Sequence, residues 1–184
     1  MRLNDPLITC FIYNGKEYTI DLAFDNVLDV FDVLNDDTLR NNEKAEITLE
    51  LLLDEHIEED IIGIWNYIYK EFIEVKSKQY IEYDLKGNPM PIQDEENDSF
   101  IDLDKDAEYI YASFMQAYNI DLYEQQGKLH WHEFKALLNG LPGDTIMQRI
   151  IQIRMWKPSK HESSEYKENM RKLQKVYALD DNVE

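Results

Sequence analysis

The sequence is poor in the residues and patterns on which several classes of protein depend. It has one cysteine, Cys10, among 184 residues, so no internal disulfide is possible and a reducing compartment is expected. No apolar run approaches the roughly 20 residues that span a bilayer, and the opening residues lack the pattern of a signal peptide. We therefore expect a cytoplasmic protein that does not insert into membranes.

Patterns typical of catalytic sites are also missing. The chain has no glycine-rich phosphate loop, serine elbow or Cys–His nucleophile pattern. Cys10 lies in a stretch rich in Ile and Phe, which predicts a small buried hydrophobic side chain rather than a nucleophile. We accordingly expect no enzymatic activity and no cofactor.

Positive charge is scarce and unevenly spread. The chain has 38 acidic and 19 basic side chains, a net charge of −19, and residues 1–98 alone have 24 acidic and 8 basic ones, a net −16. A field of this sign repels nucleic acid and anionic membranes and favours basic partners. A need for solubility alone explains the negative net charge equally well.

Apolar residues make up 43% of the chain and aromatic ones 12%, which is enough to build a core. The dipeptide Asn14-Gly15 between two alternating stretches predicts a type I′ hairpin that pairs Tyr13 with Lys16 and Phe11 with Tyr18. Apolar spacing then predicts helices over 24–34, 44–53 and 58–76, the last with a stripe of Ile61, Trp65, Ile68 and Phe72.

The second half is predicted to be helical as well. We expect a helix starting near Leu103, a short helix over 131–139 with Gly140 at its C′ position, and a third helix capped by Asp144. The third helix would bury Ile146, Ile150 and Ile153. The fold class is thus mainly α with a short N-terminal β-hairpin (α+β) and a small helical C-terminal module.

The chain divides into four predicted parts, because a loop rich in Pro, Gly and acidic residues interrupts the helical pattern. These are an acidic N-terminal part with the hairpin and helices (1–84), a linker (85–101), a helical module (102–158) and a tail (159–184). The pattern of Tyr166, Met170, Leu173 and Tyr177 in the tail fits a last helix.

The stretch DLDKDAE at 102–108 imitates the start of a calcium loop. Such a loop needs glycine at its sixth position and a bidentate glutamate at its twelfth, whereas this chain has Ala107 and Ser113 there. Three carboxylates ahead of an apolar helix are better explained as helix caps and dipole partners.

His130 and His132 are the most conspicuous candidates for chemistry. On a helix, two residues two apart lie about 200° around the axis, on opposing faces, and further ligands with recognisable spacing are missing. We therefore expect no metal site, and we interpret KLHWHEF as the start of a helix with a packed Trp131.

Two helices joined by GLPGD also resemble a helix-turn-helix. The second of them offers Gln148, Arg149, Gln152 and Arg154 to a DNA groove. The alternative is a plain helical hairpin, which the charge of −19 and the missing basic stripe favour.

Residues Asp106 to Arg154 resemble a family of phage proteins, the "g-p-fifteen" family of long-tailed phages and prophages of Gram-positive bacteria. The matching elements are the aromatic helix, Tyr118 to Leu122, Leu129-His130-Trp131 with Phe134, the stop at Leu137 and Gly140-Leu141, and Ile150 to Arg154. The acidic N-terminal half fits the family's length more loosely.

The resemblance implies a tail assembly chaperone in the host cytoplasm that binds the tape measure protein, together with other tail assembly proteins and further copies of itself. Alternatives are a structural tail or head–tail component retained in the virion, a DNA-binding regulator and a metal-dependent hydrolase. Candidates for partner binding or for packing of the module are Phe114, Tyr118, Trp131, Phe134, Arg154 and Trp156.

Overall fold

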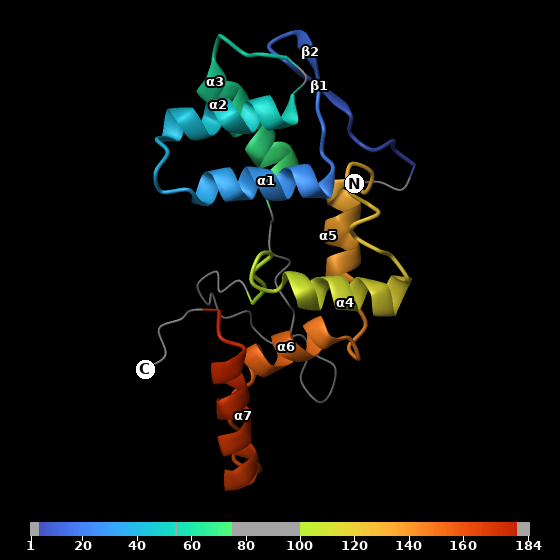
Figure 1. Cartoon of the computed structure of the whole chain (residues 1–184), viewed down its shortest axis with the longest axis vertical. Coiled ribbons are helices and arrows are strands. Elements are labelled where there is room, and N and C mark those ends of the chain that lie inside the picture. Colours follow the sequence, from blue (N-terminus) through green and yellow to red (C-terminus); the bar gives the residue numbers. More distant parts are fainter. Residues whose placement is uncertain (1–3, 54, 75–99, 180–184) are drawn as a thin grey trace.

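The computed structural model describes residues 4–53, 55–74 and 100–179 (Figure 1). A two-stranded antiparallel hairpin is followed, within these residues, by seven α-helices, which confirms the predicted α+β class. The elements are β1 (Cys10–Tyr13), β2 (Lys16–Thr19), α1 (Phe24–Asn35), α2 (Asn41–Leu52), α3 (Ile61–Ile68), the π-helical turn η1 (Tyr69–Ile73), α4 (Ala107–Tyr118), α5 (Trp131–Asn139), α6 (Ile146–Met155) and α7 (Ser164–Val176).

The hairpin has the predicted turn and register. Asn14 and Gly15 both adopt positive φ (48° and 82°), as a type I′ turn requires, and Phe11 pairs with Tyr18. The Phe11 ring stacks on Tyr18 at 5.4 Å and reaches Phe72 of η1 at 5.5 Å. A lone hairpin is marginal in water, so this packing on the helical layer stabilises it.

The prediction for Cys10 is wrong, because its side chain is exposed. Successive side chains of a strand point to opposite faces, so the burial of Phe11 turns its neighbour Cys10 outward. A hydrogen bond with the Glu17 side chain, across the hairpin, raises the pKa of the thiol. A raised pKa disfavours the thiolate, which is the nucleophilic form of cysteine.

The predicted helix over 58–76 begins later than expected and changes its winding. Asp60 adopts a left-handed conformation (φ 53°), so α3 starts at the next residue, and its continuation η1 is π-helical. Three of the four predicted stripe residues, Trp65, Ile68 and Phe72, are buried, whereas Ile61 is only half-buried. The stripe packs against the hairpin and α2.

The helix expected from Leu103 starts at Ala107 instead. The Asp102 carboxylate accepts the backbone N–H groups of Asp104 and Lys105, each at 3.0 Å, and these bonds hold the chain in turns. Asp106 occupies the N-cap position but makes no capping hydrogen bond with its side chain, contrary to the prediction.

The predicted helix over 131–139 is confirmed, although its end differs in detail. Gly140 is the C-cap with φ −94°, so it is not left-handed. A Cβ atom there would lie 3.2 Å from the Ala136 carbonyl oxygen, which is a tight contact. Thr145, not Asp144, precedes α6 as its N-cap.

The apolar stripe of α6 is rotated relative to the prediction. The buried side chains are those of Met147, Ile150 and Ile151, while Ile146 and Ile153 are only half-buried. The first turn of α6 is fixed on α4, because the Met147 N–H donates to the Ser113 hydroxyl at 3.1 Å. This contact directs the Met147 side of the helix into the core.

The tail contains the predicted helix, α7, whose N-cap Ser163 accepts the Tyr166 N–H at 3.1 Å. The helix has no buried residue, and it extends away from the remainder of the molecule (Figure 1). The predicted linker at 85–101 lies almost wholly outside the described residues, and the division into domains stays a prediction.

Candidate interaction site

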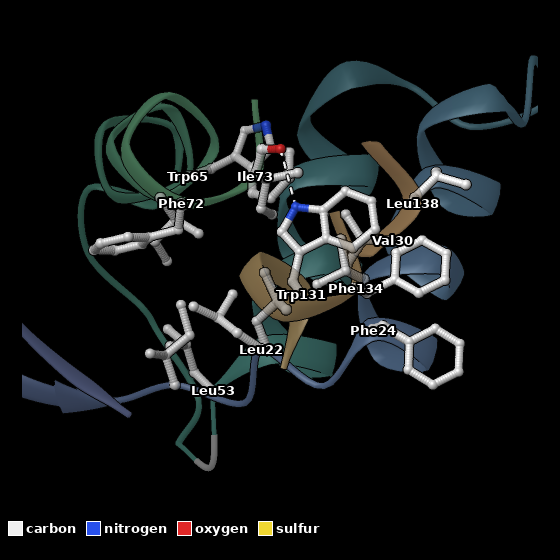
Figure 2. Packing of buried hydrophobic residues seen from close by; sticks show 14 of the residues in the cluster. Leu22, Phe24, Val30, Leu53, Trp65, Phe72, Ile73, Trp131, Phe134 and Leu138 are labelled. Atoms are coloured by element: carbon white, nitrogen blue, oxygen red, sulfur yellow. Dashed lines mark hydrogen bonds between the residues drawn. The ribbon is translucent and has the colours of Figure 1, made fainter. Parts of the chain in front are cut away.

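Trp131 is at the centre of the core that joins the two halves of the chain (Figure 2). Its side chain is 1% exposed, stacks on Phe134 at 5.6 Å and meets the edge of Phe31 at 5.7 Å. The indole N–H donates to the Ile73 carbonyl at 3.2 Å, and the backbone N–H donates to the Leu22 carbonyl at 2.7 Å. Trp131 and Phe134 are thus buried, as packing residues would be, but Trp131 packs on Leu22, Phe31 and Ile73 of the N-terminal half and not within the C-terminal module alone.

Phe134 connects α5 to the helices on either side. Its ring stacks on Phe24 of α1 at 5.0 Å and on Phe114 of α4 at 5.3 Å. Phe114 in turn meets Tyr118 edge-on at 5.7 Å, and the Tyr118 hydroxyl donates to the Leu137 carbonyl at 2.9 Å. Three of the candidates, Phe114, Trp131 and Phe134, are thus buried, and Tyr118 is half-buried beside them.

His130 is the N-cap of α5. Its Nδ1 accepts the His132 N–H at 3.1 Å, and its Nε2 lies 3.0 Å from the Ile8 carbonyl oxygen. A carbonyl can only accept, so Nε2 carries the proton in the neutral ring. Glu133 accepts the His130 N–H at 3.3 Å and completes a capping box.

The prediction that the two histidines lie on opposing faces is wrong. His130 precedes the helix in an extended conformation (φ −70°, ψ 144°), so the 100° rotation per residue does not apply to it. The rings of His130 and His132 stack at 5.2 Å instead. No group of three or more His, Cys, Asp or Glu able to hold a metal occurs in the described ranges.

The environment of His132 keeps its ring neutral. Burial, and then the positive charge of Lys135, lower the pKa of His132 from 6.5 to about 4. The unfolded chain therefore binds a proton between pH 6.5 and 4 that the folded chain does not bind. Stability that is present above pH 6.5 is lost as the pH falls through this window.

We expect the free energy of unfolding to fall between pH 7 and pH 5 by about 1 kcal/mol more in the wild type than in His132→Gln. Urea unfolding at pH 7 and at pH 5 measures the free energy of unfolding. The lower pH stays above the isoelectric point of about 4.5. His161→Gln, at an exposed position, is the control and should behave as wild type. Equal pH dependence in wild type and His132→Gln would refute this role of His132.

Arg154 and Asp106 form an almost fully buried ion pair. Two guanidinium nitrogens donate to the two carboxylate oxygens at 2.6 and 2.7 Å. The same guanidinium donates to the carbonyls of Phe100 at 2.8 Å and Tyr177 at 2.7 Å. Arg154 thereby joins α6 to the start of α4 and the end of α7, and its charge is not available to a DNA phosphate.

Trp156, the last candidate, follows α6 and is half-buried. Its indole N–H donates to the Glu162 carboxylate at 3.2 Å, and its ring meets Tyr166 edge-on at 6.2 Å. It therefore lies near the start of α7, away from the aromatic core around Trp131.

An exposed apolar surface on α4 and the turn after it was not predicted from the sequence. Tyr111 and Tyr123 lie 5.3 Å apart, and Met115 follows Tyr111 by one helical turn. Tyr123 is 73% exposed and Met115 38%. We call these three residues the Tyr–Met face. The tyrosine at 123 gave no periodic pattern from which this surface could have been predicted.

The described residues thus define a mainly helical α+β protein in which four candidates, Phe114, Tyr118, Trp131 and Phe134, share one aromatic cluster. Arg154 and Trp156 lie outside this cluster, at the end of α6. In the part of the chain that is described, every helix is too short or too polar to cross a bilayer. The family model described as Bacteriophage Gp15 protein matches residues 3–179, and the chain belongs to this family of phage proteins. Neither the curated proteins nor the solved structures gave a match.

Proposed function

We propose that this protein is a non-enzymatic tail assembly chaperone. It would bind the tape measure protein in the host cytoplasm, together with other tail assembly proteins, until the tail tube forms around it. Membership of the phage family over residues 3–179 carries the proposal, because it makes the chain a structural or assembly-related phage protein. Beyond what family membership implies, we propose the chaperone role and a Gram-positive host.

The Tyr–Met face supports a client of apolar helices. Tyrosine supplies a large apolar ring with a polar end, and methionine adapts to irregular apolar surfaces. Tyr111, Met115 and Tyr123 lie together on the surface, within the stretch that carries the family resemblance. We therefore assign client binding to this face, and packing to the buried candidates Trp131, Phe134 and Phe114.

The main alternative is a structural tail component that stays in the virion. Mass spectrometry of purified virions separates the two functions. A chaperone should be missing from the particle or present far below the stoichiometry of the tail proteins, whereas a structural component should appear at a fixed ratio to them.

The double variant Met115→Ser/Tyr123→Ser should bind the tape measure protein at least about tenfold more weakly, while its unfolding midpoint stays near that of the wild type. Both side chains are exposed, so their removal opens no cavity. Ile12→Ser is the matched control, since Ile12 is 67% exposed on the hairpin, and it should bind as the wild type does. Loss of binding in the control alone, or in neither protein, would contradict the assignment.

Washing the co-purified complex at low and at molar salt tests the nature of the contact. Apolar contacts persist at 1 M salt, whereas purely electrostatic ones weaken as the Debye length shrinks from about 10 Å at 0.1 M to about 3 Å. Retention at both salt concentrations supports the Tyr–Met face. Loss at high salt alone would assign the contact to the acidic N-terminal half.

A further inference from the structure

Helix α7 is attached to the molecule mainly by its C-terminal end. The Gln174 side chain donates to the carbonyls of Ile153, Arg154 and Trp156, at 3.0, 3.3 and 2.9 Å, and so caps the end of α6. Arg154 holds the Tyr177 carbonyl, as described above. At this same end of α7, Leu173 and Val176 are 38% and 72% exposed, so the helix presents apolar side chains to water there.

The charge of this region is opposite to that of the rest of the chain. Residues 145–179 have 8 basic and 3 acidic side chains, a net +5, in a chain of −19. Helix α7 itself has four basic and two acidic side chains, a net charge of +2. The basic ones are Lys167, Arg171, Lys172 and Lys175. Residues 1–74 have 18 acidic and 5 basic side chains, a net −13. With Asp180, Asp181 and Glu184 included, residues 145–184 have a net charge of +2, so the α6–α7 region is positive whereas residues 1–74 are strongly negative.

A cavity of about 280 Å³ lies between α2 and the start of α3, in the acidic half. Its lining combines two carboxylates with two isoleucines, one of which, Ile62, is 43% exposed. The lining residues are Asn42, Glu46, Asp60, Ile61 and Ile62. The two isoleucines offer apolar contact and Glu46 offers negative charge to a helix with Leu173 and Val176 beside Lys172 and Lys175, while the Asp60 carboxylate accepts the Tyr13 hydroxyl at 2.8 Å. We call this site the α2–α3 cavity.

The chain cannot fill its own cavity, because α7 and the α2–α3 pair lie at opposite ends of the longest axis (Figure 1). We propose that α7 of one copy docks in the α2–α3 cavity of a second copy. Such a contact joins two different surfaces, so in a pair of copies one cavity and one α7 stay free, on different copies, for further copies to bind. Head-to-tail contacts of this kind build rings or open helical filaments.

This inference deepens the proposed function, because a coat around an extended client needs copies that contact one another. A helix of 13 residues is about 20 Å long, so the contact buries less than the roughly 1,200 Å² of a stable complex. We therefore expect weak association of the free protein, strengthened when several copies are bound to one client.

Sedimentation equilibrium of the full chain alone, at 50 and 500 mM NaCl, measures this association without any client. The α7 variant is Lys172→Glu/Lys175→Glu, and the cavity variant is Glu46→Lys/Glu50→Lys, in which Glu50 lies one turn beyond Glu46 on α2. All four side chains are exposed. The control Asp29→Lys/Asp32→Lys makes the same change of charge as the cavity variant, on exposed positions of α1.

The wild type should self-associate at 50 mM NaCl and at least about tenfold more weakly at 500 mM. Each docking variant alone should lose at least about tenfold in affinity, and an equimolar mixture of the two should recover it, since each reversed surface then meets a complementary one. The control should stay within about twofold of the wild type. Recovery in the mixture also shows that both variants are folded.

Three results would overturn the proposal. The first is a wild type that is monomeric at every protein concentration and at both salt concentrations. The second is a cavity variant that associates as the wild type does. The third is a mixture that fails to recover affinity although both proteins show native circular dichroism. Normal association of the cavity variant with loss in the α7 variant would indicate pairing of two α7 helices instead. Since no client is present, each result leaves the chaperone function to be tested separately.

Discussion

Replacing Trp131 by alanine is expected to lower the free energy of unfolding by about 3–5 kcal/mol. The side chain is 1% exposed and projects from the start of α5 toward α1 and η1. Its removal therefore leaves a cavity where the two halves of the chain meet. It also leaves the Ile73 carbonyl, which accepts the indole N–H, without this partner. Denaturant unfolding followed by circular dichroism measures the loss.

Trp156→Ala is the matched control for this experiment. Trp156 is half-buried and contacts Glu162 and Tyr166 near the N-terminal end of α7, outside the aromatic core. We expect it to cost no more than about 1–2 kcal/mol. If Trp131→Ala keeps its stability within about 1 kcal/mol of the wild type and loses client binding instead, Trp131 is an interface anchor and the packing role is wrong.

Asp106→Asn should destabilise the protein by about 3–5 kcal/mol, because it leaves the buried Arg154 guanidinium without its counter-charge. The pair also holds three segments together through the Phe100 and Tyr177 carbonyls. Exposed pairs contribute far less, so Lys172→Met, which removes a pair with Glu168, should leave the free energy of unfolding close to that of the wild type and serves as the control.

The double variant Asp106→Leu/Arg154→Met separates the charge from the packing. Apolar side chains of similar size leave no buried ion, so the double variant should be at least about 2 kcal/mol more stable than the sum of its single changes predicts. Simple additivity of the two single variants would contradict an energetic coupling across the pair. Urea unfolding of all four proteins of the cycle provides the comparison.

Elements governed by local sequence were predicted well. The hairpin register follows from one Asn-Gly turn, and the helix over 131–139 follows from its apolar spacing and the residues at its ends. Turn and helix preferences act over a few residues, so a sequence displays them directly. The late starts of α3 and α4 were missed, because Asp60 and Asp102 redirect the backbone locally in ways that apolar spacing does not reveal.

Contacts between distant residues could not be predicted in the same way. Asp106 and Arg154 are 48 residues apart, and nothing in the spacing of charges indicates that they pair. His130 was assigned to a helical face, whereas its role as N-cap places its ring on that of His132. The Tyr–Met face arises only when the turn after α4 brings Tyr123 beside Tyr111.

We propose that this phage protein keeps the tape measure protein soluble by binding it. The most direct measurement is the soluble fraction of the tape measure protein when it is expressed alone and when it is expressed with this chain. We predict that it is insoluble alone, and that with this chain it becomes soluble and co-purifies at both low and molar salt. A client that is soluble alone, or that forms no complex at either salt concentration, would contradict the claim.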